Sequence, residues 1–276
     1  LPVELIELRA AVERFVDTEL VPREAAGLTG DDERLIRRRL HELGIWALGT
    51  PERLGGAGGG ALARIVVIEQ LSRSLLGLQL AGRMGEPLPI LAAATPEQQD
   101  RYLRPVVRGE ALGAFALTEP TGGSDPVGTM ATTARRVGSG WVVDGRKCFV
   151  SLGDIADYVI VFARTDPAAG AKGITAFIAD AGTPGFSVVR RIPTMGSLQP
   201  AEIDFHDCAV PDANRLGEVG QGFVLAQQLL GQARLEIGAR ATGACERLIA
   251  LAIEHVRARE SFGTPLSDRQ GVQWML

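Results

Sequence analysis

Residues 220–258 carry an apolar stripe with helical spacing, and this stripe limits the possible folds more than any other feature of the chain. Apolar residues recur there at intervals of three and four, as in an amphipathic helix. An unbroken helix would be roughly 58 Å long, at about 1.5 Å per residue. Such a helix cannot bury its apolar faces in one small domain. Gly231, Gly238 and Gly243 weaken it locally, and we interpret them as positions of close helix contact.

The residues after this stripe predict the start of another helix. Residues 263–265 (Gly-Thr-Pro) interrupt the pattern, and residues 267–270 have the spacing of a capping box. The sequence stops at Leu276, within that expected helix. Two explanations are open: the chain associates with copies of itself, or further residues follow.

The N-terminal part of the chain, residues 1 to about 112, is also predicted to be helical. Residues 5–15 show apolar positions at spacings of three and four, and a second helix fits residues 32–43. Residues 95–98 (Thr-Pro-Glu-Gln) predict a helix start, with Thr95 as the cap and Gln98 completing a capping box.

The middle of the chain is rich in strand-forming residues and in prolines. Residues 158–163 and 173–179 are predicted strands, and residues 141–150 read as a hairpin with its turn at Asp144 and Gly145. We therefore predict an α+β protein with a helical domain at 1–112, a mainly antiparallel β domain at 113–218 and the start of a helical bundle at 219–276.

Composition narrows the function class. The net charge of −4 gives no electrostatic basis for binding nucleic acid or an anionic membrane. No apolar run reaches about 18 residues, and no signal peptide opens the chain, so a cytoplasmic protein is expected. Three scattered cysteines and three scattered histidines predict no metal site. Residues 55–60 are glycine-rich, but no predicted strand precedes them, so a dinucleotide fingerprint is rejected.

Residues 115–125 (FALTEPTGGSD) form an apolar run that ends in a turn of small residues. Gly122 and Gly123 allow the backbone to approach a ligand closely. Thr118 and Ser124 offer hydroxyls for hydrogen bonding. These residues predict a ligand-facing turn at a strand end, and the alternative is a solvated Gly-Ser loop.

The same string resembles the FALTEPGAGSD signature of acyl-CoA dehydrogenases. Residues 51–58 (PERLGGAG) resemble the PExxGGAG turn of that family, and residues 144–151 (DGRKCFVS) resemble its DGxKxWIT strand. Residues 207–211 (DCAVP) are similar to its DVxVP element, and residues 259–270 are similar to its ERxxFGxPLxxxQ signature. The resemblance runs over nearly the whole chain.

The resemblance implies the fold given above, with FAD bound between the β domain and the C-terminal bundle of a homo-oligomer, a dimer or a homotetramer. It implies oxidation of an acyl-CoA to the 2,3-enoyl-CoA, in fatty acid metabolism. The resemblance further implies that a carboxylate removes the α-proton while a hydride moves to the flavin, and that electrons then pass to an electron-transfer flavoprotein.

The resemblance also assigns residues to the cofactor and the substrate. Phe115, Leu117 and Thr118 would lie near the isoalloxazine ring, with Gly123 admitting the ligand. Ser124 would meet the pantetheine chain or the flavin diphosphate.

In the strand motif, Phe149 stands where the family has Trp, and Val150 and Ser151 take the next two places. An aromatic ring and a hydroxyl are thereby kept beside the flavin. The alternative for Phe149 is an ordinary core residue of a strand.

Near the C-terminus, Arg259, Phe262 and Gln270 resemble residues that reach the FAD of a neighbouring subunit. The alternative for Arg259 is a solvated cation at a helix end. Arg234 resembles an arginine near the substrate acyl group.

The catalytic base is not identified. Ala233 occupies one position that the family uses for the base, and alanine accepts no proton. Glu236 is a weaker candidate, and its alternative is a charge on the helix surface. Three hypotheses are open: an acyl-CoA dehydrogenase with a base beyond residue 276, a non-catalytic flavin-binding subunit of a mixed oligomer, or an acyl-carrier-protein dehydrogenase or flavin monooxygenase on the same fold.

Overall fold

The computed structural model of the protein describes residues 1–26, 30–80, 84–88, 91, 94–195 and 199–276. The chain forms two compact units. One is helical and consists of Leu1–Gly49, Gly59–Met84 and Arg234–Leu276. The other contains a β-sheet and consists of Thr50–Gly58 and Gly85–Ala233. In the described part of the chain, every helix is too short or too polar to cross a membrane.

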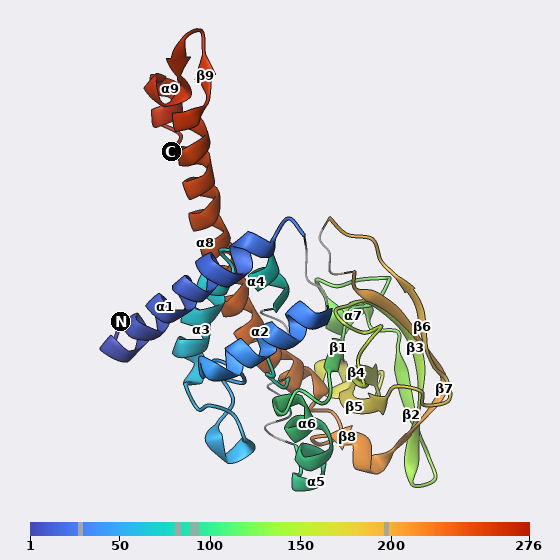
Figure 1. The fold of residues 1–276 in the computed structure, drawn as a ribbon. Coiled ribbons are helices and arrows are strands. Elements are labelled where there is room, and N and C mark those ends of the chain that lie inside the picture. The colour runs from blue at the N-terminus through green and yellow to red at the C-terminus, as the bar shows by residue number, and fades with distance from the viewer. Residues whose placement is uncertain (27–29, 81–83, 89–90, 92–93, 196–198) are drawn as a thin grey trace. The chain divides into compact units, whose positions relative to one another are not determined.

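The helical unit begins with four α-helices (Figure 1): α1 (Val3–Phe15), α2 (Gly30–Glu42), α3 (Gly60–Leu71) and α4 (Leu75–Leu80). A π-helical turn (Val16–Leu20) and a 3-10 turn (Val21–Arg23) follow α1. Helix α1 packs against α3. Many apolar positions of these helices are buried, including Val12, Phe15, Ile36, Leu40, Val67 and Ile68. Ile6 and Leu35, which the spacing also places on the apolar faces, are exposed.

Helix α8 (Gly222–Ala258) runs unbroken over 37 residues, which confirms the long helix. Its length is about 56 Å at 1.5 Å per residue. Close contact is confirmed at Gly243, where an added Cβ would lie 1.9 Å from the carbonyl oxygen of Glu69 on α3. The predicted close contact is absent at Gly238, where nothing in the described part of the helical unit lies within 4 Å of an added Cβ. At Gly231, which belongs to the sheet unit, close contact stays a prediction.

The predicted capping box at residues 267–270 is wrong. The chain forms a short hairpin, β9 (Glu260–Ser261) and β10 (Thr264–Pro265), then a 3-10 turn (Leu266–Asp268) and α9 (Gln270–Gln273). The residue before α9 is Arg269, whose side chain does not cap the helix. Instead its guanidinium donates to the Ser261 carbonyl and the Thr264 hydroxyl, at 2.8 and 2.9 Å, and fastens the hairpin.

In the sheet unit, short helical segments precede the strands. They are α5 (Pro96–Gln98), a π turn (Gln99–Leu103) and α6 (Arg104–Val107). The capping box between Thr95 and Gln98 is confirmed. Gln98 also donates to the carbonyls of Ala213 and Arg215, which ties this segment to the end of the sheet. A 3-10 turn (Glu52–Leu54), rather than a strand, precedes the glycine-rich residues.

The sheet has eight strands in the order β6-β7-β3-β2-β4-β5-β8, with β1 paired to β4 (Figure 1). Their bounds are β1 (Gly113–Ala116), β2 (Thr133–Val137), β3 (Gly140–Val150), β4 (Tyr158–Arg164), β5 (Ile174–Asp180), β6 (Phe186–Arg191), β7 (Ala201–Pro211) and β8 (Arg215–Leu216). Most pairs are antiparallel, as predicted, but β4 pairs in parallel with both β1 and β2. Helix α7 (Pro126–Thr129) and two 3-10 turns, Gly170–Gly173 and Asp212–Asn214, lie between strands.

The predicted hairpin turn at Asp144 and Gly145 is wrong. Both residues lie inside β3, where the register with β7 shifts. The turn is at Gly138, which has φ +56° and joins β2 to β3. Gly145 has φ +147°, and an added Cβ would lie 2.5 Å from the Thr132 hydroxyl. The glycine therefore serves a bulge and a close approach rather than a turn.

The helix contact at Gly243 gives a matched pair of substitutions. Gly243→Ala should destabilise the protein by roughly 1–3 kcal/mol, because the new methyl group meets the backbone of α3. Gly238→Ala should stabilise it by about 0.5–1 kcal/mol, because alanine favours the helix and has room there. Urea unfolding of the two variants checks this. Equal effects of the two substitutions would contradict the contact.

Candidate functional site

Residues 118–125 form a tight turn at the end of β1. Glu119 and Gly122 exchange two backbone hydrogen bonds, at 3.3 and 3.1 Å. The Asp125 carboxylate then caps α7 by accepting from the Gly128 amide at 2.9 Å. A Cβ at Gly123 would lie 3.2 Å from the Thr118 methyl group. The turn is therefore closely packed on one side and exposed on the other, where Gly123 and Ser124 lie.

A bulge at the end of β3 turns Phe149 out of the sheet. Lys147 pairs with Ile203 and Val150 with Ala201, so β3 has one extra residue in this interval. Phe149 adopts φ +55° and its surface is 59% exposed. The alternative interpretation of Phe149 as a core residue is therefore wrong. A bulky residue held in this strained conformation is a mark of a functional site.

A backbone hydrogen bond joins the turn to the bulge. The Cys148 amide donates to the Thr118 carbonyl at 2.9 Å, which places Thr118 beside the residue that precedes Phe149. Two other predicted site residues, Leu117 and Val150, have buried side chains. Phe115 is half-buried and packs on Phe162, with ring centroids 5.0 Å apart.

Three predicted hydroxyls are open for a ligand. Thr118, Ser124 and Ser151 make no side-chain hydrogen bond within the described residues. Ser124 and Ser151 are exposed, and Thr118 is half-buried. The Cys148–Thr118 backbone hydrogen bond thus joins the segment that carries the exposed Phe149 ring to Thr118, whose hydroxyl has no hydrogen-bond partner among the described residues.

We call Thr118 and Phe149, which the Cys148 amide joins, the Thr118–Phe149 edge. A buried ion pair lies next to this edge in the sequence. The Lys147 ammonium donates to Glu119 Oε1 at 2.7 Å and to the Leu117 carbonyl at 3.2 Å. The Glu119 carboxylate also accepts from the backbone amides of Ala131 and Thr132, at 2.6 and 3.0 Å. The two side chains are 0% and 4% exposed.

Within the pair, each charge favours the ionised form of its partner and opposes the effect of burial. Burial lowers the pKa of Lys147 to about 8, and the Glu119 carboxylate opposes this shift. Burial alone would raise the pKa of Glu119. The charge of Lys147 and the hydrogen bonds from Thr132 and Ala131 outweigh burial, so that the pKa is lowered.

Sequence reasoning assigned no role to Glu119 or Lys147. A signal was present in the spacing. If residues 141–150 form one continuous strand, Trp141, Val143 and Lys147 all face the same side, and the structure shows that side to be buried. A lysine at an inward position requires a buried acceptor. The sequence does not show which carboxylate supplies it.

The C-terminal candidates lie on the hairpin and on α9 of the helical unit. Phe262, at the hairpin tip, is 99% exposed with φ +53°. Arg259 is exposed, and its carbonyl accepts from the Leu266 amide at the base of the hairpin. Gln270 is exposed and begins α9. The hairpin tip thus presents an exposed aromatic ring, and Arg259 directly precedes the hairpin in the sequence.

The candidates on α8 differ in their surroundings. Arg234 is exposed and Ala233 is half-buried. Glu236 forms an ion pair with Arg64 of α3 at 2.8 Å, and its side chain is only 12% exposed. The surface-charge interpretation of Glu236 is therefore wrong. Its carboxylate is thus engaged by the Arg64 guanidinium and is not open to a substrate in this arrangement.

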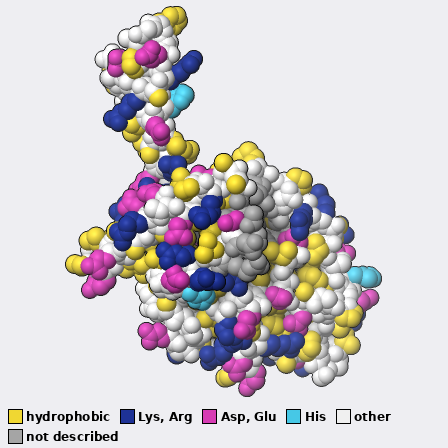
Figure 2. All heavy atoms as spheres, in the orientation of Figure 1, with side chains coloured by type: hydrophobic (Ala, Val, Ile, Leu, Met, Phe, Trp, Pro, Cys, Tyr) yellow, Lys and Arg dark blue, Asp and Glu magenta, His cyan; other side chains and the backbone are white. Residues whose placement is uncertain are grey.

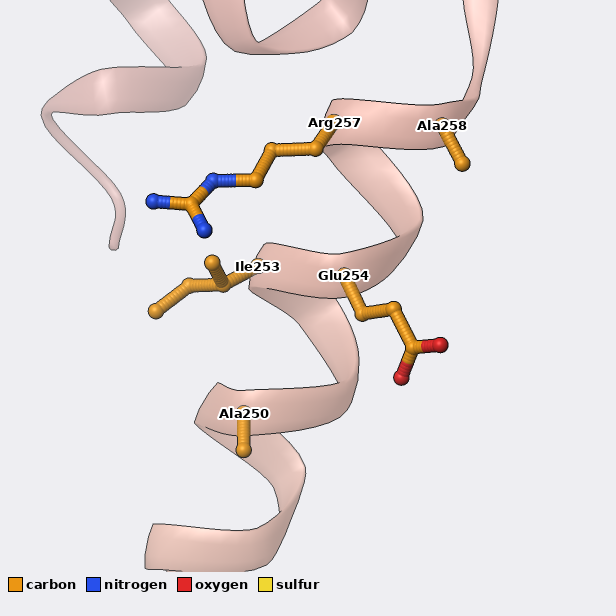
Figure 3. A pocket seen from close by; sticks show the side chains of 5 residues that line it. All are labelled: Ala250, Ile253, Glu254, Arg257 and Ala258. Carbon is orange, nitrogen blue, oxygen red and sulfur yellow. The ribbon is translucent and has the colours of Figure 1, made fainter.

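The C-terminal part of α8 has a shallow hollow, lined by Ala250, Ile253, Glu254, Arg257 and Ala258. Ile253 and Arg257 point to one side of the helix and Glu254 to the other (Figure 3). Hydrophobic and charged side chains are mixed over this segment (Figure 2). All the lining residues belong to one helix, so the hollow does not enclose a ligand and is no candidate site.

The strain at Phe149 can be measured. Phe149→Gly should be more stable than Phe149→Ala by about 1 kcal/mol, because only glycine adopts positive φ without strain. Alanine keeps the strain and loses the same ring, so it is the matched control. Thermal unfolding of the two variants without cofactor gives the difference. Equal stability would mean that Phe149 is not strained.

Comparison with known proteins agrees with this geometry. Models of the N-terminal, middle and C-terminal domains of acyl-CoA dehydrogenases match residues 3–110, 114–208 and 220–276. Acryloyl-CoA reductase (NADH) of Anaerotignum propionicum is 39% identical over 87% of this chain and 62% of its own length. The mitochondrial short-chain specific acyl-CoA dehydrogenase of Rattus norvegicus is 35% identical over 98% of this chain and 66% of its own length.

The chain thus spans just under two thirds of the length of these two curated relatives. Among solved structures, butyryl-CoA dehydrogenase of Megasphaera elsdenii is 34% identical with a TM-score of 0.86, covering 99% of this chain and 74% of that one. The three ordered domain models, the sequence identity and the shared fold show that the chain belongs to the acyl-CoA dehydrogenase family.

Proposed function

We propose that the protein is an FAD-dependent acyl-CoA dehydrogenase that converts an acyl-CoA thioester to its 2,3-enoyl-CoA. The observation that carries this proposal is the edge formed by Thr118 and Phe149, joined through the Cys148 amide. Family membership supports a flavin there, and the identity to a short-chain specific acyl-CoA dehydrogenase supports a CoA thioester.

The residues of this edge fit a flavin. Phe149 offers an exposed ring on which a flat ring system stacks. The free hydroxyls of Thr118 and Ser151 provide hydrogen bonds at its rim. Gly123 leaves a space that a side chain would fill against Thr118. Bound FAD would supply the hydride chemistry, and the protein would supply binding, orientation and a low-dielectric environment.

The remaining assignments concern the substrate and a neighbouring subunit. Ser124 would bind pantetheine or the flavin diphosphate, and Arg234 would lie near the acyl group. Arg259, Phe262 and Gln270 would reach the FAD of another subunit, with the Arg259 guanidinium on the pyrophosphate. The 99% exposure of Phe262 supports this, because an aromatic ring so fully in water gains by being covered.

The assembly that follows is a homo-oligomer, a dimer or a tetramer. Large apolar side chains of α8 are exposed, including Leu248, Ile249 and Leu251, and so is Trp274, the residue that follows α9. Electrons would pass to an electron-transfer flavoprotein, and the protein would act in the cytoplasm. The three-part division at residues 1–112, 113–218 and 219–276 belongs to the same proposal.

The reverse reaction is the second candidate. The 39% identity to acryloyl-CoA reductase (NADH) favours reduction of a 2,3-enoyl-CoA. Both directions use the same flavin edge. An assay with enoyl-CoA and a reduced electron donor, compared with acyl-CoA and an electron acceptor, separates them.

The cofactor is tested first. The full-length protein should be yellow, and heat or acid should release FAD that chromatography identifies, because the Thr118–Phe149 edge fits an isoalloxazine ring. FMN instead of FAD would contradict the assignment. So would a protein that takes up no flavin after refolding with excess FAD.

The role of Arg259 is tested by FAD retention. Arg259→Ala should weaken FAD binding by roughly 1.5–3 kcal/mol, because it removes a two-point charged contact. Arg257 is also an exposed arginine near the end of α8, so Arg257→Ala is the matched control and should bind FAD normally. Light scattering follows the assembly of both variants. A flavin-loaded monomer at low micromolar concentration would contradict the shared site.

The proposal assigns the base to a carboxylate outside residues 1–276. Residues 1–276 supplied with FAD should show no flavin bleaching by acyl-CoA, because a proton acceptor must lie within reach of the α-carbon. Ala233→Glu should introduce slow bleaching in an assembled oligomer, and Ala233→Gln, which has no basic group, should not. Stopped-flow absorbance measures this. Rapid bleaching by the unmodified residues 1–276 would overturn the assignment.

A further inference from the structure

One ion pair holds together the two segments that form the proposed flavin edge. The Lys147 ammonium donates hydrogen bonds to the Leu117 carbonyl and the Glu119 carboxylate, so it binds the residues on both sides of Thr118. Lys147 itself stands two residues before Phe149. Glu119 directly follows Thr118, and Lys147 is separated from Phe149 by one residue, so both lie close to the edge in the sequence without being part of it.

We propose that the Glu119–Lys147 pair is a positioning element of the flavin site, which fixes Thr118 and Phe149 in the geometry that binds the isoalloxazine ring. This inference rests on the proposed function. Both side chains are shielded from solvent, at 4% and 0% exposure, so neither touches the cofactor. They act through Thr118 and Phe149.

Stability alone does not explain why this pair is charged. Desolvation of two buried charges offsets most of their attraction, and an apolar pair of similar size is often as stable. The charged pair instead fixes the orientation of the backbone groups that it binds. Its four hydrogen bonds, to Leu117, Ala131, Thr132 and within the pair, orient the backbone on both sides of Thr118.

The strained backbone of Phe149 needs such an anchor. A positive φ at a bulky residue persists only where its surroundings hold it there. Lys147 is fixed on one side of the bulge by the ion pair, and Val150 is buried in the sheet core on the other. Without the ion pair, the bulge would relax and Phe149 would lose its fixed orientation.

Three variants of the full-length protein separate positioning from stability. Lys147→Met leaves a buried carboxylate unpaired and should lower both the melting temperature and FAD affinity. Adding Glu119→Gln removes that unpaired charge and should recover much of the melting temperature. Phe177→Leu, in the core of the same sheet, should lower the melting temperature with FAD affinity unchanged.

In the double variant, we expect the melting temperature to recover while the FAD affinity stays low. Its FAD dissociation constant should remain at least about tenfold above that of the wild type, with an altered visible flavin spectrum. Wild-type FAD affinity and spectrum in the double variant would overturn the inference, and so would FAD loss that follows melting temperature in all three variants. A wild-type protein that binds no FAD would overturn the proposed function, and with it this inference.

Discussion

The burial of the Lys147 ammonium is the constraint on which the described site depends. An ammonium group without a partner in the sheet interior would destabilise the fold strongly. The chain satisfies it with the Glu119 carboxylate and the Leu117 carbonyl, both from the segment after β1. That requirement places the turn at residues 118–125 against the end of β3. The Thr118 backbone is thereby hydrogen-bonded to Cys148, the residue before Phe149.

Two departures from regular strand geometry in β3 complete the arrangement. At Gly145 the backbone passes so close to Thr132 that no side chain fits, and the register with β7 shifts. At Phe149 a second shift turns an aromatic ring outward at a positive φ. In a regular strand, alternation would place residue 149 on the same face as the buried Lys147, so the ring would be buried. The cost in strain is consistent with a binding role.

Periodicity and capping chemistry predicted the elements of the fold well, because they are local. The long helix and α2 followed from the spacing of apolar residues, β4 and β5 from runs of strand-forming residues, and the Thr95 cap from its residue types. The failures at Gly145 and Ser267 have one cause. A glycine or a capping motif has several local uses, and distant residues decide between them: Thr132 for the bulge, and Ser261 and Thr264 for the Arg269 side chain. The partners of Lys147 and Glu236, 28 and 172 residues away in the sequence, were invisible for the same reason.

Amide hydrogen exchange at Cys148 tests the central claim most directly. Its amide donates to the Thr118 carbonyl and reports whether turn and bulge are held together. In cofactor-free protein, Lys147→Met should speed exchange in a peptide covering residues 146–151 at least about tenfold, corresponding to roughly 1.4 kcal/mol of local opening. A peptide covering the core strand β5 should change far less. Unchanged exchange at residues 146–151, or an equal increase in both peptides, would contradict the account.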